Sequence, residues 1–227
     1  MSRTLDGVGG PHADAELVVG GAPAAAAEVA VVLVHGRGGT AQGMIRLADG
    51  FYRPGVTLLA PAARRSSWLP VPHDAPLAAT EPALTSAVDC VAGAVAAAGE
   101  VGIAPERTAF VGVSQGGCVL AEFLCRRPQR FGGAFVVSAA LPGESVDRRE
   151  VAGDPAHDPR PLAGTPVALD ASEGDPHVPR DRVEATATVL ERGGATVDMR
   201  IDPGAGHGLS NATVARIGER LDALLDE

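Results

Sequence analysis

The chain contains no lysine, and its charge is strongly unbalanced toward acid. All 19 basic residues are arginine, against 28 aspartates and glutamates, so the formal net charge is −9. The densest basic clusters are pairs of adjacent arginines, at 64–65, 126–127 and 148–149. A nucleic-acid-binding face requires a broader basic patch than this, so we exclude that class of function.

Long hydrophobic runs are also missing, although 45% of the residues are hydrophobic. Apolar stretches such as VAVVLV fall far short of the roughly 20 residues that cross a bilayer as a helix, so we predict no membrane span. The N-terminal segment MSRTLDGVGGPHADAEL lacks the basic and apolar regions of a secretory signal, and we expect a cytoplasmic protein. No linker or change in composition divides the 227 residues, which predicts a single domain over 1–227.

Cysteine is scarce as well. Cys90, Cys118 and Cys125 form no C-x-x-C pair, and an odd number suits neither a disulfide framework nor a zinc site. Cys118 and Cys125 are seven residues apart in a predicted helix and share a face, which indicates core packing. The cysteines therefore suggest neither a disulfide framework nor a metal site, and the reaction inferred below requires no metal or organic cofactor.

What the chain does have is an alternation of short β-branched runs with longer segments rich in alanine and leucine. This order is typical of an α/β protein with a mostly parallel sheet, here of about seven strands, and helices on both faces. We predict strands at 16–19, 29–35, 56–61, 108–113, 134–138, 167–171 and 197–201, and helices at 40–49, 81–98, 115–126, 180–192 and 211–225.

Two proline-rich segments, 62–82 and 142–165, lack this periodicity. Loops of this length in a compact protein are either functional or disordered. We expect both segments to border a substrate pocket.

A glycine-flanked serine lies where the strand at 108–113 turns into the next helix. Gly112, Ser114 and Gly116 fit the pattern G-x-S-x-G, in which a sharp turn strains the serine backbone and glycine avoids steric collision. The hydroxyl of Ser114 is then presented at the carboxyl end of the sheet, in front of the positive end of the helix. This context favours a nucleophilic serine over a structural one.

A serine hydroxyl needs a base that takes its proton, and in this architecture the acid and then the histidine follow the serine. His207 lies in a glycine-rich loop between the last strand and the last helix, at the same sheet edge as Ser114, and is the favoured base. His157 lies in an irregular loop and is expected to be solvated. His177 also follows a strand, but it lies beside Asp175, which suggests that this loop supplies the acid.

Four acidic residues compete to orient the histidine: Asp170, Glu173, Asp175 and Asp202. Asp170 lies inside a predicted strand and would point to a sheet face. Asp202, on the same connection as the favoured histidine, fits a turn or capping role. Asp175 lies in a turn after a strand, where a carboxylate can fix the imidazole tautomer, and is favoured over Glu173.

An oxyanion hole requires two backbone N–H donors aimed at the carbonyl oxygen under attack. The amide of Gln115, directly after the serine, is one candidate. The loop HGRGG at 35–39 follows a strongly apolar strand and is the expected source of the second. This loop lacks the G-x-G-x-x-G spacing and the Lys-Ser/Thr pair of a phosphate-binding loop, which disfavours a nucleotide site.

Together these motifs resemble the α/β-hydrolases and, more narrowly, the phospholipase/carboxylesterase family that includes acyl-protein thioesterases. The resemblance rests on LVHGRGGT, APAA with SSWLP after it, GVSQGG, GDPHVP and GAGHGLS, in the family's order between residues 29 and 210. It implies the following roles: nucleophile Ser114, acid Asp175, base His207, oxyanion donors Arg37 and Gln115, and Trp68 near the acyl pocket.

The activity that the resemblance implies is hydrolysis of a small-molecule carboxylic ester or thioester without a cofactor. Thioesterase-like members often have an aliphatic residue at the position of Arg37. A guanidinium there suggests a polar or anionic substrate portion, against the alternative of an arginine turned to solvent or paired with a surface carboxylate.

Two other hypotheses stay open beside this one. The first is a dienelactone-hydrolase-like enzyme, although such enzymes have cysteine as the nucleophile where this chain has Ser114. A non-catalytic ligand-binding or receptor protein on the same scaffold would not need the intact set of residues. The sequence also leaves open whether the protein is a monomer or a homodimer.

Overall fold

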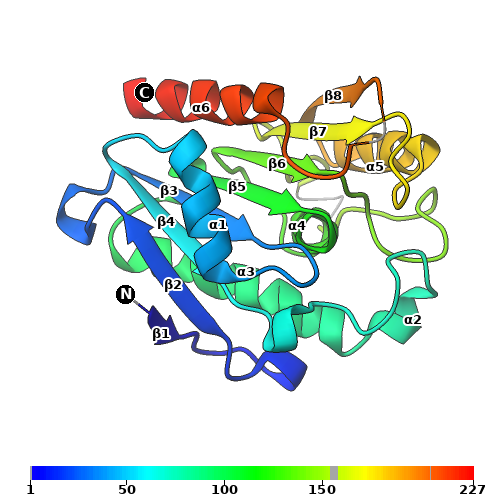
Figure 1. Ribbon diagram of the computed structural model, residues 1–227, viewed down its shortest axis with the longest axis horizontal. Coiled ribbons are helices and arrows are strands. Elements are labelled where there is room, and N and C mark those ends of the chain that lie inside the picture. The colour runs from blue at the N-terminus through cyan, green and yellow to red at the C-terminus, as the bar shows by residue number, and fades with distance from the viewer. Residues whose placement is uncertain (1, 154–157, 205) are drawn as a thin grey trace.

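Figure 1 shows the computed structural model, which describes residues 2–153, 158–204 and 206–227. Within these residues the strands form one eight-stranded sheet in the order β1-β2-β4-β3-β5-β6-β7-β8. The pairs β1/β2 and β2/β4 are antiparallel, and all other pairs are parallel. The expected mostly parallel sheet is confirmed, with one strand more than predicted, because β1 (Ser2–Thr4) is short, exposed and without an apolar pattern.

The other strands and the helices follow the predicted alternation. The strands are β2 (Glu16–Gly21), β3 (Val29–Val34), β4 (Val56–Pro61), β5 (Thr108–Val113), β6 (Gly133–Val137), β7 (Pro166–Ser172) and β8 (Thr196–Asp202). The α-helices are α1 (Ala41–Leu47), α2 (Leu77–Thr80), α3 (Ala83–Glu100), α4 (Gln115–Arg126), α5 (Arg180–Arg192) and α6 (Asn211–Asp226). Short 3-10 helices lie at Gly10–His12, Ala24–Ala26, Ala48–Gly50, Arg64–Ser66 and Pro105–Arg107. The single turn of α2 was not predicted.

Local chemistry fixes several of these boundaries. The side chain of Ser210 accepts a hydrogen bond from the amide of Thr213 and caps α6, and Thr40 caps α1 through the amide of Gly43. After α5, Gly194 has a φ of 97°, a left-handed conformation that glycine adopts without steric cost.

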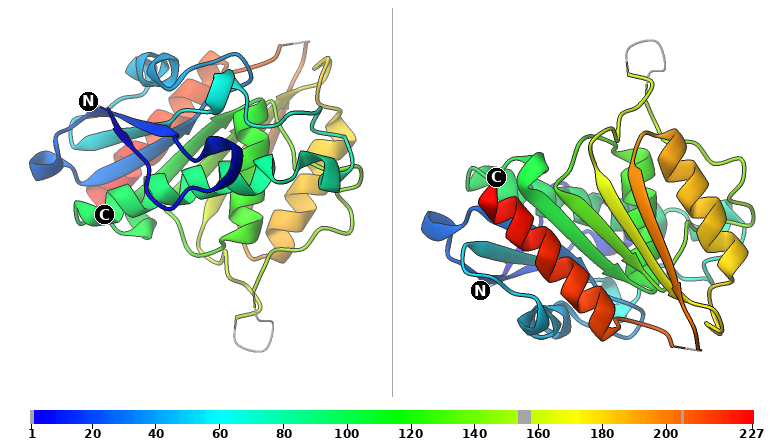
Figure 2. Two further views of the ribbon diagram at one scale, coloured as in Figure 1. Left: turned by 90° about the horizontal axis from the view of Figure 1, so that it is seen from below. Right: turned by 90° about the horizontal axis from the view of Figure 1, so that it is seen from above.

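Helices cover both faces of the sheet, and each face has its own core. α3, α4 and α5 pack on one face, and α1 and α6 pack on the other (Figure 2). The central strands β3 and β4 are buried along their whole length, as expected for strands covered on both sides. The edge strand β8 alternates instead between exposed and half-buried residues.

Among the described residues, α3 is the helix that is long and apolar enough to cross a membrane by length and composition. In this structure 56% of it is buried, and it contacts α4, β3 and β4. Its apolar surface is therefore used inside the fold.

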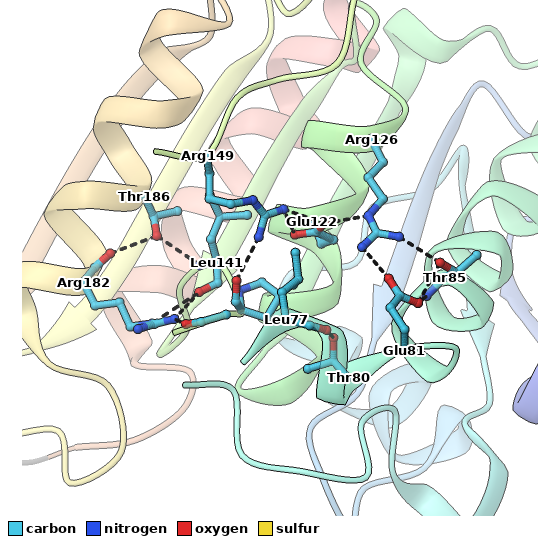
Figure 3. Close-up of polar contacts among 12 residues, drawn as sticks. Leu77, Thr80, Glu81, Thr85, Glu122, Arg126, Leu141, Arg149, Arg182 and Thr186 are labelled. Carbon is cyan, nitrogen blue, oxygen red and sulfur yellow. Dashed lines mark hydrogen bonds and ion pairs between the residues drawn. The ribbon is translucent and has the colours of Figure 1, made fainter. Parts of the chain in front are cut away.

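A buried ionic cluster anchors the two long loops to α4 (Figure 3). The carboxylate of Glu122 accepts hydrogen bonds of 2.6 Å from Arg126 and from Arg149, which belongs to segment 142–165. Arg126 also donates to Glu81, at 2.7 Å, and to Thr85. These contacts hold both loops close to the carboxyl half of α4.

Candidate active site

The register of the parallel strands brings several polar residues to one edge of the sheet. Val34 of β3 pairs with Gly112 of β5, and Val113 pairs with Val137 of β6. The residues that follow these strands therefore emerge side by side at the carboxyl end of the sheet, where open α/β sheets place their sites. They are His35, Ser114 and Ser138.

Ser114 occupies a strained turn between β5 and α4, with φ 53° and ψ −125°. A Cβ on Gly112 would lie 2.7 Å from the carbonyl oxygen of Gly116, and a Cβ on Gly116 would collide with the carbonyl of Val34. Glycine is thus required on both sides because the start of α4 lies directly against β5 and the end of β3. The expected sharp turn is present.

A continuous hydrogen-bond chain runs from Ser114 through His207 to Asp175. Oγ of Ser114 lies 2.9 Å from Nε2 of His207, and Nδ1 of His207 lies 2.8 Å from Oδ2 of Asp175. The other carboxylate oxygen of Asp175 accepts from the amides of His177 and Val178, at 2.9 and 3.2 Å. With Nδ1–H donating to Asp175, the Nε2 lone pair is free to accept the serine proton.

Two opposing effects set the pKa of Asp175. Burial alone raises it, but the hydrogen bonds from His207 and from the two backbone amides outweigh burial, and the pKa lies below the ordinary value. Asp175 is therefore a carboxylate at neutral pH, the form that stabilises an imidazolium beside it.

The competing residues have other roles. Asp170 lies within β7 and pairs with Arg216 of α6, as its position inside a strand suggested. The backbone carbonyl of Asp202 accepts from the amide of Glu173. The ring of His177 packs edge-on against His207, with centroids 4.9 Å apart. His157 lies outside the described residues.

A cleft of about 510 Å³ opens in front of the serine. Arg37 and Gln115, the two residues expected to supply oxyanion donors, both line it. Gln115 is the first residue of α4, where backbone amides have no partner within the helix. From segment 62–82, Pro72 and His73 line the cleft. In its described part, segment 142–165 contributes no lining residue to this cleft, although the amide of its Gly143 donates to the carbonyl of His73, so that it borders a substrate pocket stays a prediction.

His35 orients the peptide bond that carries the amide of Arg37. One ring nitrogen, Nε2, accepts from the amide of Ala63 at 3.1 Å, so the other, Nδ1, carries the proton and donates to the carbonyl of Gly36 at 2.8 Å. In a trans peptide the C=O and the N–H point in opposite directions. Holding the Gly36 carbonyl on the His35 side therefore turns the Arg37 N–H away from it.

The resemblance implied that Trp68 lies near the acyl pocket, but Trp68 is not among the residues that line the cleft, so a direct role in binding substrate is not supported. Its side chain is 1% exposed and packs between His12 and His35, with ring centroids 5.4 and 5.0 Å away. Its Nε1 donates to the carbonyl of His35 at 2.8 Å, and its own amide donates to the side chain of Gln115 at 2.7 Å. Trp68 supports the site from behind, because a large ring with one polar atom fits a buried position where that atom is satisfied.

Two further supporting residues were not predicted. His12 accepts from the amide of Arg64 and lies 3.1 Å from the carbonyl of Trp68, and burial lowers the pKa of His12 and keeps it neutral. Ser138, directly after β6, accepts from the amide of Gly208, the residue after His207, at 2.8 Å. Ser138 could have been predicted as a site residue, because it is a polar residue directly after a buried strand. The sequence around His12 gives no indication of its partners.

The cysteines offer no alternative nucleophile. Cys118 lines the cleft, but burial raises the pKa of its thiol to about 11. Burial likewise raises the pKa values of Cys90 and Cys125 to about 12. Thiols of this kind are not ionised at neutral pH and do not act as nucleophiles. In the described part of the chain, no group of three or more histidine, cysteine or acidic side chains could hold a metal ion.

A mostly parallel sheet covered on both faces, with a strained serine after β5, defines an α/β-hydrolase. Within that class, a family model described as phospholipase/carboxylesterase matches residues 15–225. The chain belongs to the phospholipase/carboxylesterase family, and it is a hydrolase of the carboxylesterase type.

Solved structures agree with this assignment. A phospholipase/carboxylesterase from Dyadobacter fermentans is 32% identical, with a TM-score of 0.82 over 92% of this chain and 95% of its own. SOBER1 L63A from Arabidopsis thaliana (21% identity, TM-score 0.69, 88% and 100% covered) and a Bacillus cereus carboxylesterase (20%, 0.67, 92% and 93%) share the fold. No curated protein matches the chain.

Proposed function

We propose that the protein hydrolyses carboxylic esters with Ser114 as nucleophile, His207 as general base and Asp175 as the acid that orients His207. The observation that carries this proposal is the unbroken hydrogen-bond chain from Oγ of Ser114 to the carboxylate of Asp175, with links of 2.9 and 2.8 Å. The strained backbone of Ser114 supports it, since such strain persists where the surrounding structure enforces it and is concentrated at active sites.

In the first half of the reaction, His207 takes the proton of Ser114 as Oγ attacks the ester carbonyl. The amides of Arg37 and Gln115 donate to the developing oxyanion, and Asp175 stabilises the imidazolium. His207 then gives the proton to the departing alcohol, which leaves Ser114 acylated.

In the second half, water replaces the alcohol. His207 deprotonates the water as it attacks the acyl carbonyl, and it returns the proton to Oγ of Ser114 when the acid departs. Thioesters react by the same two steps, with a thiol as the leaving group, and are the second substrate class that these residues suit.

The test combines substrate turnover with covalent labelling. Wild type is assayed on p-nitrophenyl esters of increasing acyl length and on a matched acyl thioester, and it is treated with a fluorophosphonate probe. We expect turnover and a single label on Ser114, and neither in Ser114→Ala. The matched control is Ser145→Ala, at an exposed serine in segment 142–165, which should keep both.

Absence of both turnover and label in folded wild type would refute the proposal. It would favour instead a non-catalytic ligand-binding protein on a hydrolase scaffold. A label that persists in Ser114→Ala would place the nucleophile elsewhere.

A further inference from the structure

The charged and hydrogen-bonding groups around the cleft are unevenly distributed. Arg37, His73 and His177 line it together with the serine and His207, whereas no aspartate or glutamate is found among the described residues of its wall. The wall of the cleft therefore differs in sign from the chain as a whole, which has a net charge of −9. The carboxylate of Asp175 is fully buried behind His207 and does not face the cleft.

The guanidinium of Arg37 is held in place without being neutralised. Its Nη2 donates to the carbonyl oxygens of Leu69 and Val71, at 3.3 and 3.1 Å. Within the described residues, Arg37 forms no ion pair; the residue is exposed, and these two hydrogen bonds restrict where its guanidinium lies. Because arginine keeps its proton, it presents a fixed positive charge beside the serine, with further N–H donors available for a ligand.

His73 adds a polar atom that lacks a partner. Its Nε2 is buried and has no hydrogen bond within the described residues, although buried polar atoms in proteins are nearly always bonded. The backbone around it is fixed, since the amide of Gly143 donates to the carbonyl of His73 at 2.7 Å. Because His73 lines the cleft, a ligand bound there is the partner that we assign to this nitrogen.

The surroundings of His73 keep its ring neutral. Burial lowers its pKa, and the nearby charge of Arg182 lowers it further, against smaller opposite effects of Asp74 and Asp175. His73 therefore contributes a hydrogen bond, and Arg37 contributes the charge. Asp74 is exposed, does not line the cleft and forms no ion pair with Arg37 among the described residues.

Building on the ester hydrolysis proposed above, we propose that the cleft selects esters that bear a carboxylate, bound by the guanidinium of Arg37 and by Nε2–H of His73. The planar guanidinium matches the two oxygens of a carboxylate. Such a contact is screened less by salt when it is partly enclosed by a cleft. The substrate class is then a half-ester of a dicarboxylic acid, or an ester of a hydroxy acid.

The test uses two matched substrate pairs that place the carboxylate on opposite sides of the ester. Monoethyl adipate is compared with ethyl hexanoate, for a carboxylate on the acyl side, and 6-acetoxyhexanoate with hexyl acetate, for one on the alcohol side. We expect kcat/KM of wild type to favour the carboxylate ester by about tenfold or more in one of the pairs, which also locates the anion.

For each variant we measure the ratio of kcat/KM for the carboxylate ester to kcat/KM for the neutral ester of the favoured pair. Arg37→Gln and His73→Phe should lower this ratio, the first to near one. Arg127→Gln is the matched control, because it removes the same charge from an exposed arginine at the far end of α4 and should leave the ratio unchanged. Inhibition of ethyl hexanoate hydrolysis by adipate gives a second readout on wild type alone.

The outcomes separate this inference from the function on which it rests. Turnover of the neutral esters and labelling of Ser114, with no preference for either carboxylate ester and no inhibition by adipate, would overturn the carboxylate site alone. A preference that Arg37→Gln leaves unchanged would overturn it too. Failure of all esters and of the label would instead overturn the esterase proposal.

Discussion

Asp175 and Glu122 are both carboxylates with fully buried side chains, yet their surroundings differ in one decisive respect. Asp175 is bonded to a histidine and to two backbone amides at the edge of the sheet. Glu122 is bonded to Arg126 and Arg149. A histidine can release its proton near neutral pH, whereas an arginine cannot.

The comparison shows that burial by itself does not mark a catalytic carboxylate. The Glu122 cluster holds α4, α3 and segment 142–165 together through hydrogen bonds between a carboxylate and two guanidinium groups, and it contains no histidine. In the mechanism proposed above, the partner of Asp175 is a histidine whose charge changes during the reaction. Substitutions at the two sites should therefore affect different properties of the protein.

The largest expected effect is on catalysis, from Asp175→Asn. We expect kcat to fall about 10⁴-fold, because an amide cannot stabilise the imidazolium and can favour the wrong tautomer of His207. The melting temperature should change little by comparison. Steady-state kinetics and thermal unfolding measure the two quantities, and a loss of activity below about tenfold would contradict the role proposed for Asp175.

The next largest effect is on stability, from Glu122→Gln. We expect the free energy of unfolding to fall by about 3–5 kcal/mol, because the side chain of Arg149, 18% exposed, loses its carboxylate. Arg126 keeps Glu81 as a partner. Denaturant unfolding measures the loss, and kcat of the folded enzyme should change little.

A double variant sharpens this second prediction. Replacing Glu122 and Arg149 together by methionine removes both charges and should cost less than the sum of the single changes. Additive losses would mean that the two residues do not stabilise each other. A large loss of kcat in Glu122→Gln, at unchanged stability, would abolish the contrast with Asp175.

A smaller effect on kcat is expected from substitution of His35, which is buried and neutral and lies, like Asp175, at the candidate active site. His35→Leu removes one of the two hydrogen bonds to the Gly36 carbonyl that orient the Gly36–Arg37 peptide; the other, from the amide of Gly39 at 3.0 Å, remains. We expect kcat to fall by up to about 10²-fold with little change in KM, as for a misplaced oxyanion donor. Trp68→Phe, which removes one bond to the carbonyl of His35, is the control and should lower kcat less.

The smallest effect concerns acid stability. Burial raises the folded-state pKa of both Asp175 and Glu81, but hydrogen bonds outweigh this effect. The hydrogen bonds to Asp175 lower its pKa below 3.8, and those from Arg126 and Thr85 lower the pKa of Glu81 below 4.5. A lowered folded pKa contributes stability that is complete above the unfolded value and is lost as pH falls through the folded value.

Unfolding free energy should therefore show no loss from these two groups down to about pH 5 and a progressive loss below it. Asp175→Asn and Glu81→Gln should each reduce the acid slope. Glu144→Gln, at an exposed glutamate, serves as the control. Stability that rises on acidification through this range would reverse the assigned direction of both pKa shifts.

Much of the fold followed from local patterns in the sequence. The bounds of β4, β5, α4 and α5 agree with prediction at both ends, because apolar periodicity and helix-ending glycines act over a few residues. β1 escaped prediction because three exposed residues carry no such pattern. α2 escaped for a similar reason, as one turn inside a proline-rich segment.

The residues of the site likewise fall into those that sequence patterns predicted and those that they did not. The glycines around Ser114 and the order of the acid and the histidine along the chain are sequence features, and they pointed to residues that the fold brings within hydrogen-bond distance. The orientation of Trp68 was not predicted, because an aromatic residue in a loop near the motif gives no indication of which way its ring turns. His12 lies far in sequence from Arg64 and Trp68, which it contacts.

By itself, then, the sequence determined the alternation of strands and helices, the strained serine turn and the residue types that an acyl-transfer site needs. Only the tertiary structure decided that Trp68 is buried between two histidines, that Arg149 of segment 142–165 is bonded to Glu122, and that Arg37 lines the cleft with no ion pair to any described residue. The reason is physical: backbone conformation depends on neighbouring residues, whereas the partner of a side chain depends on the packing of segments that are distant in sequence.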